Sequence, residues 1–265
     1  MDNPAIAHDG KDMPPTQKEK RPVGWLLFIV QLASVILTYL VASFLPALPA
    51  VLAQMEAGGG EPALGSATVA ATVIIGMAAT LLVCWLWLRR EGRVAEAWDL
   101  SAPANWARTV LLAALTTFGA IAIFSGGGAL LEWQGTPAPD ASFVLDFVTE
   151  SPQLFLLWIV GVAILAAGLG EELLWRGFLM NRLERLGGLR GRIWLVLIVQ
   201  AILFGLPHAY QGVGGMIVTG AVGLLLGLVR IMQRGNLWAV IIAHASVDVI
   251  MMTLAYADKL GWFAT

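Results

Sequence analysis

The stretch VGWLLFIVQLASVILTYLVASF, residues 23–44, contains no charged residue. An α-helix needs about 20 mostly apolar residues to cross the hydrocarbon core of a bilayer, so this stretch predicts a transmembrane helix. Similar stretches recur along the chain, and together they predict an all-α, polytopic transmembrane helix bundle with about seven to eight membrane spans. The predicted spans are Val23–Phe44, Ala67–Leu88, Thr109–Leu131, Gln153–Gly170, Ile193–Pro207, Val213–Val229 and Leu237–Tyr256.

The composition agrees with a protein embedded in a lipid bilayer. Of the 265 residues, 58% are hydrophobic and 13% are charged, whereas soluble domains are about half apolar and about a quarter charged. The net charge of −2 gives no reason to expect a nucleic-acid partner. The one cysteine, Cys84, lies in an apolar stretch, so we expect it to serve in packing.

Basic residues fall on alternate sides of the predicted spans. All Lys and Arg residues except Lys259 lie before the first span or in the loops after spans two, four and six. The opposite loops contain no basic residue but six acidic ones: Glu56, Glu61, Glu132, Asp140, Asp146 and Glu150. Lys and Arg concentrate in the cytoplasmic loops of membrane proteins. We therefore expect an integral membrane protein with its N-terminus in the cytoplasm, and the compact loops suggest the bacterial inner membrane.

Six ionisable residues lie within or next to these apolar stretches. An ionisable side chain at the centre of a membrane span costs about 2.5–3.5 kcal/mol to insert, so such a residue is a candidate for function. Three of them stand in GLGEELLWRGFL, residues 168–179. The six are Glu171, Glu172, Arg176, His208, His244 and Asp248.

The spacing of these residues predicts two pairs. Residues four apart share one face of a helix, which places Glu172 beside Arg176 and His244 beside Asp248. Glu171 is turned by about 100° from Glu172 and is left to face another partner. Each feature alone also has a structural reading: an ion pair at a helix end, a hydrogen-bonded packing histidine, or a helix crossing held by a polar pair.

Together, the carboxylates and imidazoles predict a hydrolytic centre. Hydrolysis of a peptide bond needs a base that deprotonates water and donors that stabilise the oxyanion. A glutamate in a poorly hydrated cavity suits the first task. Alternatively, two histidines and a carboxylate can hold a zinc ion with an open position for water. The residues alone leave both mechanisms open.

Three sequence motifs resemble those of a known family. EELLWR (Glu171–Arg176), FGLPH (Phe204–His208) and HASVD (His244–Asp248) are similar to the ordered motifs EExxxR, FxxxH and HxxxN/D of the CPBP intramembrane proteases. That group includes the type II CAAX prenyl endopeptidases and Abi-like proteins. The resemblance extends over about Ala163 to Val249 and implies a polytopic helical intramembrane endopeptidase.

The resemblance also implies roles for individual residues. Glu171 would be the general base and His208 would help to activate the water. His244 and Asp248 would stabilise the oxyanion or bind a metal. Glu172 and Arg176 would shape the site. The last motif ends in Asp248, where the prenyl endopeptidase branch has Asn, and an anion is the better metal ligand or histidine partner. A divalent metal such as zinc, if present, would take its ligands from Glu171, His208, His244 and Asp248.

The depths of the two histidines conflict in a bundle of straight helices. At about 1.5 Å per residue, His244 lies about 11 Å along its span from Asn236, and His208 lies about 24 Å along its span from Arg192. Either residues 182–192 dip into the membrane, or the fifth span starts elsewhere. The resemblance implies a cavity open toward the cytoplasm, and this favours the dip.

These observations divide the chain and predict its activity. We expect a disordered cytoplasmic tail (1–22), N-terminal transmembrane helices (23–150), a protease core (151–256) and a C-terminal tail (257–265). The predicted activity is hydrolysis of a peptide bond in a membrane-associated peptide or protein. Two alternatives stay open: a catalytically silent scaffold, immunity or regulatory protein of the same fold, and a proton-coupled carrier.

Overall fold

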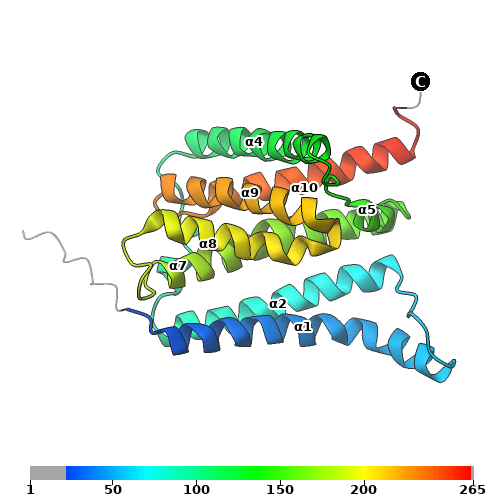
Figure 1. Ribbon diagram of the computed structural model, residues 1–265, viewed down its shortest axis with the longest axis horizontal. Helices are drawn as coiled ribbons and strands as arrows, with labels where there is room; N and C mark the ends of the chain where they lie inside the picture. Colours follow the sequence, from blue (N-terminus) through cyan, green and yellow to red (C-terminus); the bar gives the residue numbers. More distant parts are fainter. Residues whose placement is uncertain (1–21, 264–265) are drawn as a thin grey trace, which may run out of the picture.

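The structure, a computed structural model, describes residues 22–263, and the predicted disordered tail lies almost entirely outside these residues. Within the described part the chain forms helices and no β-strand, which confirms the predicted all-α fold. Figure 1 shows the helices running back and forth along one axis. They are α1 (Trp25–Glu56), α2 (Ser66–Arg90), α3 (Val94–Ala97), α4 (Trp106–Trp133), α5 (Ser142–Val148), α6 (Pro152–Leu157), η1 (Trp158–Leu179), α7 (Met180–Leu183), α8 (Ile193–Gly205), η2 (Leu206–Gln211), α9 (Gly212–Met232) and α10 (Trp238–Lys259).

Six helical segments of the described chain are long and apolar enough to cross a membrane. This number is lower than the predicted seven to eight spans. The difference lies in the 40-residue segment Ile193–Met232, because it contains both the fifth and the sixth predicted span. A short 3₁₀ turn, η2, joins α8 to α9 within this segment, so the hydrophobic sequence continues without a polar loop.

Helices α8 and α9 pack against each other as an antiparallel pair through glycines. A Cβ atom added at Gly205, near the end of α8, would stand 2.3 Å from the carbonyl oxygen of Met216 near the start of α9. A Cβ atom added at Gly227, near the end of α9, would stand 2.8 Å from Leu197 near the start of α8. Small residues allow this close approach of helix backbones.

The segment Pro152–Leu183 forms the centre of the bundle and carries the first sequence motif. Its N-terminus is capped by Ser151, whose hydroxyl accepts the Leu154 N–H at 3.3 Å. Over Trp158–Leu179 it is a π-helix, a rare form that is frequent at functional sites. Glycines bring neighbouring helices close on two sides: a Cβ atom at Gly168 would meet Ala245 of α10 at 2.6 Å, and one at Gly170 would meet Met77 of α2 at 2.5 Å.

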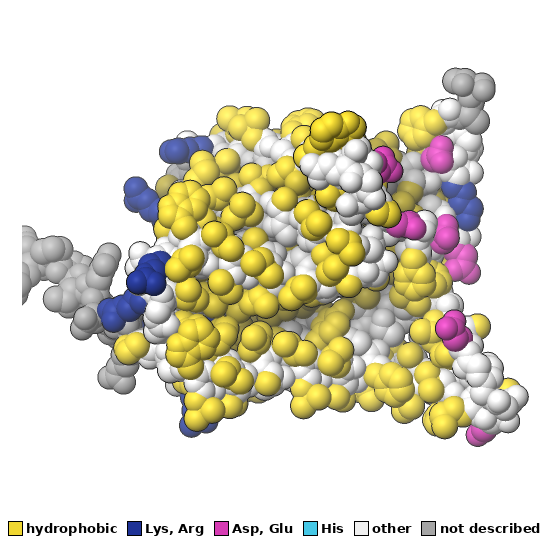
Figure 2. Space-filling view, in the orientation of Figure 1, with side chains coloured by type: hydrophobic (Ala, Val, Ile, Leu, Met, Phe, Trp, Pro, Cys, Tyr) yellow, Lys and Arg dark blue, Asp and Glu magenta, His cyan; other side chains and the backbone are white. Residues whose placement is uncertain are grey.

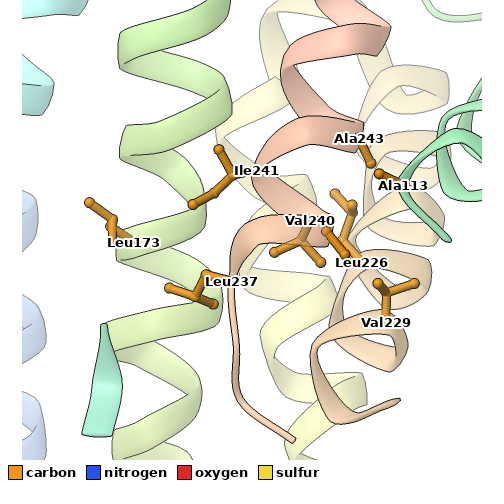
Figure 3. Packing of buried hydrophobic residues seen from close by; sticks show 9 residues of the cluster. Ala113, Leu173, Leu226, Val229, Leu237, Val240, Ile241 and Ala243 are labelled. Carbon is orange, nitrogen blue, oxygen red and sulfur yellow. The ribbon is translucent and has the colours of Figure 1, made fainter. Parts of the chain in front are cut away.

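A hydrophobic cluster fixes α10 against the central helix. Figure 3 shows Leu237 and Ile241 of α10 beside Leu173 of η1, while Val240 faces α9. These side chains are buried. The cluster therefore sets the position of the first turns of α10 relative to η1, and with it the position of His244.

Charged side chains separate to the two ends of the bundle. On the face drawn in Figure 2, Lys and Arg gather at the end where α1 begins, which we call the basic end, and Asp and Glu gather at the opposite, acidic end together with one basic side chain. This separation is the one expected for a protein that crosses a bilayer with its basic end in the cytoplasm. The orientation itself stays a prediction.

A group of polar side chains closes the basic end and is called the end cluster: Glu91, Arg182, Arg185 and Gln31. One carboxylate oxygen of Glu91 accepts from Arg182 at 2.7 Å and from Arg185 at 3.0 Å. The other accepts from Gln31 of α1 at 3.0 Å. Burial by itself would raise the pKa of Glu91, but the nearby Arg182 charge and the hydrogen bonds from Arg185 and Gln31 lower it below its ordinary value.

Candidate active site

The two adjacent glutamates of η1 face different surroundings. Glu172 is fully buried, and one of its carboxylate oxygens, Oε1, accepts a hydrogen bond from Arg176 at 2.8 Å. The two residues are four apart on one helix, so the structure contains the ion pair that the spacing predicts. Glu171 is partly exposed and lines an internal cavity.

The guanidinium of Arg176 is held on three sides. Besides Glu172, it donates to the carbonyl oxygen of Gly223 in α9 at 3.2 Å and lies over the ring of Phe204, 4.1 Å from its centroid. The Gln200 amide donates to the same Gly223 carbonyl at 2.8 Å. These contacts fasten η1 to the α8–α9 pair directly behind the site.

His244 of α10 meets the same oxygen of Glu172. Its Nδ1 atom lies 2.6 Å from Glu172 Oε1, and its Nε2 atom lies 3.8 Å from a carboxylate oxygen of Asp248. Glu172 pairs with Arg176 and so acts as an ionised acceptor, which assigns the proton of this hydrogen bond to Nδ1. We call Glu172, Arg176 and His244 the inner cluster.

Four of the six predicted residues line one cavity of about 890 Å³: Glu171, His208, His244 and Asp248. The other two, Glu172 and Arg176, lie behind it and are fully buried. Most residues of the wall are apolar. One carboxylate oxygen of Glu171 is buried and has no hydrogen-bond partner among the described residues, while the residue as a whole is partly exposed and lines the cavity.

His208 lies in η2, directly after α8. Its Nδ1 atom is 3.0 Å from the carbonyl oxygen of Phe204. A carbonyl can only accept, so Nδ1 carries a hydrogen and the neutral ring has its free lone pair on Nε2. The Phe204 ring centroid lies 5.3 Å from that of His208 and 6.1 Å from that of His244, so the second and third motifs meet around one phenylalanine.

The depth conflict between the histidines is resolved by α10 rather than by residues 182–192. Helix α8 begins at Ile193, as predicted. Helix α10 begins deeper, because Leu237 packs beside Leu173, only one residue beyond Glu172. The Trp98–Asp99 segment lies beneath this start: Trp98 donates to the Leu173 carbonyl at 2.8 Å, and Leu237 donates to the Asp99 carbonyl at 3.0 Å.

The cavity opens away from the predicted cytoplasmic side. Its most exposed lining residues include Leu40, Phe143 and Tyr210, at 60%, 58% and 54% exposure, and the last two lie on α5 and η2 at the acidic end. Its lining toward the basic end, Phe178 and Leu179, is 2% exposed. The most exposed part of the lining therefore lies toward the acidic end, whereas the resemblance implies an opening toward the basic end.

Several residues of the site had not been identified as such from the sequence. Tyr39 of α1 and Tyr210 of η2 line the cavity, and the rings of Tyr210 and His208 lie 6.0 Å apart. A tyrosine in an apolar helix gives no signal by itself, because such residues are common in membrane proteins. Gln200 was detectable, since it is an uncharged polar residue in an otherwise apolar stretch.

The predicted metal ligands do not converge on one point in this structure. Among residues 22–263, no group of three or more His, Cys, Asp or Glu side chains has the arrangement of a metal site. His244 uses Nδ1 for Glu172, and its Nε2 faces Asp248. No catalytic step is therefore assigned to a metal, and the chelator assay described below tests the metal alternative.

Comparison with known proteins supports the resemblance. The family model described as Rce1-like, type II CAAX prenyl endopeptidase Rce1-like, matches residues 152–250. This segment contains all three motifs and confirms the resemblance predicted from them. A search of curated proteins and a search of solved structures each found no match. The matched segment, less than half of the chain, is therefore similar to that of type II CAAX prenyl endopeptidases.

Proposed function

We propose that this protein is an intramembrane endopeptidase in which Glu171 activates the attacking water. The observation that carries the proposal is the unpaired carboxylate oxygen of Glu171, in a cavity that His208, His244 and Asp248 also line. A carboxylate with a free lone pair accepts a proton from water, and an apolar wall favours this transfer because it solvates the carboxylate poorly.

The two histidines supply complementary functions. His208 has its Nδ1 hydrogen on the Phe204 carbonyl, so its Nε2 lone pair accepts a hydrogen bond from the water and orients it. His244 stands between the carboxylates of Glu172 and Asp248, and this surrounding favours the imidazolium form. Its Nε2–H then donates to the oxyanion of the tetrahedral intermediate.

The reaction balances without a further reactant. Glu171 takes a proton from water, and the hydroxide oxygen bonds to the carbonyl carbon of the scissile peptide. The negative charge moves to the carbonyl oxygen, where His244 donates to it. When the carbon–nitrogen bond breaks, Glu171 returns the proton to the leaving nitrogen, and a carboxylic acid and an amine result; the acid then passes its proton to the amine, which gives a carboxylate and an ammonium group.

The direct test is Glu171→Gln in purified protein. Wild type and variant are incubated in detergent with a quenched peptide library, and we expect the variant to lose about 10²- to 10⁴-fold in rate, the usual contribution of a positioned base. Glu61→Gln in the exposed loop between α1 and α2 is the matched control and should keep full activity. Equal cleavage by wild type and Glu171→Gln would contradict the proposal, and absence of cleavage would favour a scaffold.

A chelator tests the metal alternative in the same assay. We expect cleavage to persist after treatment with a chelator, because Glu171 itself serves as the base. Elemental analysis of the purified protein accompanies the assay. Loss of cleavage on chelation, restored by zinc at about one ion per chain, would assign a metal to the site instead.

A further inference from the structure

The cavity has a rim formed by residues that both line it and are at least half exposed: Ile36 and Leu40 of α1, Phe143 of α5, and Leu206 and Tyr210 of η2. These five residues are the rim throughout. They come from helices far apart in sequence and are the most exposed large apolar or aromatic members of the lining, whose exposed part also includes Ser125 and Pro207. A passage bordered in this way admits an apolar chain more readily than a polar one.

The opposite end of the cavity is closed by packing and by hydrogen bonds. Val23 and Phe28 pack with Leu179, Leu183 and Leu186 in one buried cluster. The Val23 N–H also donates to the Arg185 carbonyl at 3.0 Å, and the end cluster ties Glu91 to α7 at the same end. A substrate therefore has no open path from the basic end in this structure.

Helix α1 leaves the cavity open toward the surrounding lipid at the rim. It packs mainly on α2. At the basic end Phe28 of α1 packs in one cluster with Leu183 and Val196, and Figure 1 shows the other end of α1 turning away from the rest of the bundle at the acidic end. Counted from Trp25, Ile36 and Leu40 lie about 17 and 23 Å along α1, past the middle of a membrane about 30 Å thick. The rim thus faces the half of the bilayer at the acidic end.

The surface next to the rim carries three acidic residues and one base, Lys259, whose ammonium donates to the Thr149 carbonyl. Asp140, Asp146 and Glu150 are exposed, and the first two flank Phe143 in the sequence. The Asp140 N–H donates to the Gln211 carbonyl at 3.1 Å, which holds this loop against η2. An apolar passage with carboxylates at its outer edge complements an apolar chain that ends in cations.

We propose that the substrate is a membrane-embedded peptide that enters laterally between α1 and η2, from the half of the bilayer at the acidic end, with basic residues flanking its apolar segment. This proposal rests on the proposed function for the location of the scissile bond. The entry route, however, can be tested by measuring substrate binding without hydrolysis. It assigns Leu40 and its neighbours on the rim to substrate selection.

The first experiment compares two leucines of α1. Leu40 and Leu37 are 60% and 62% exposed, but Leu40 lines the cavity and Leu37 does not. Leu40→Trp and Leu37→Trp are placed in the Glu171→Gln protein in nanodiscs. Binding is measured with a labelled, membrane-spanning peptide of leucine and alanine that ends in lysines.

We expect Leu40→Trp to weaken binding by about tenfold or more, the effect of a misfitting group in a pocket, and Leu37→Trp to leave it unchanged. Equal affinities of the two variants would overturn lateral entry at the rim. Because binding does not require hydrolysis, this result stands even if the Glu171→Gln comparison in the cleavage assay contradicts the proposed function.

The second experiment tests the basic flank. The same peptide is prepared with glutamates in place of the lysines, and we expect about fivefold weaker binding at low salt, as for an exposed ion pair. The difference should shrink at high salt because the charges are exposed. Equal or stronger binding of the glutamate peptide would overturn the assignment of a basic flank.

Discussion

The inner cluster and the end cluster use the same chemical groups for different purposes. Each joins one carboxylate to arginine, and in each the carboxylate accepts from two side chains through one oxygen. In the end cluster the second oxygen of Glu91 accepts from Gln31, whereas the second oxygen of Glu172 has no partner among the described residues. The carboxylate of the end cluster is thus paired at both oxygens, whereas the carboxylate of the inner cluster is paired at one, the oxygen that holds Arg176 and His244.

The clusters also differ in their access to water. Glu172 and Arg176 are 0% exposed, whereas the Glu91 side chain is 21% exposed at the basic end. A charge left without its partner costs more when it is fully buried, because water cannot replace that partner. The comparison therefore predicts how substitutions rank in the stability that they remove.

The largest effect should come from Glu172→Met. This change leaves the Arg176 cation buried without a counter-charge, and we expect a loss of about 3–5 kcal/mol in unfolding free energy, measured by SDS titration in mixed micelles. The double change Glu172→Met with Arg176→Met should recover most of that loss, because it removes both charges. A double variant as unstable as the single one would refute this account of the pair.

Gly168→Val should lower the unfolding free energy by less than Glu172→Met does. The added side chain would collide with Ala245 of α10, so α10 must move and His244 with it. We expect a cost of about 1–3 kcal/mol and slower cleavage with little change in KM.

Gly126→Ala in α4 is the control for Gly168→Val, because a Cβ atom there has no neighbour within 4 Å. We expect it to keep both stability and activity. If Gly168→Val cleaves at the wild-type rate, the close contact of η1 with α10 is not needed to position His244.

The smallest effect concerns the pH dependence of the end cluster. The pKa of Glu91 is lowered in the folded protein, so its stabilising contribution is complete above its unfolded value of about 4.3 and is lost as the pH falls through the lower folded value. We expect about 1 kcal/mol or less.

The measurement is the unfolding midpoint of wild type and Glu91→Gln between about pH 6 and pH 3. The wild type should lose more stability on acidification than the variant does. Parallel pH curves for the two proteins would mean that Glu91 is not stabilised as an anion.

The sequence predicted what depends on near neighbours along one helix. The Glu172–Arg176 pair and the common face of His244 and Asp248 follow from a spacing of four residues. The bond between His244 and Glu172 joins residues 72 apart. It depends on how closely α10 approaches η1 at Gly168, which no local pattern encodes.

In the fold too, the sequence predicted single helices but not how they pack against one another. Apolar length located the spans, but it could not show that α10 starts deeper than α8, because this depends on Trp98 and Asp99 packing beneath Leu237. The exposed part of the cavity lining could not be located from the sequence for a related reason. It depends on where α1 leaves the bundle, and a hydrophobic helix carries the same composition whether it packs or faces lipid.

The glycine contact between α8 and α9 has a consequence for biosynthesis. Helix α8 has 13 residues and is about 20 Å long, shorter than the hydrocarbon core of about 30 Å. Its Gln200 amide finds its acceptor only on Gly223 of α9. We therefore expect the two helices to leave the translocon together as one hairpin. The ribosome must then complete α9, which ends at Met232, before His208 reaches its position at the cavity.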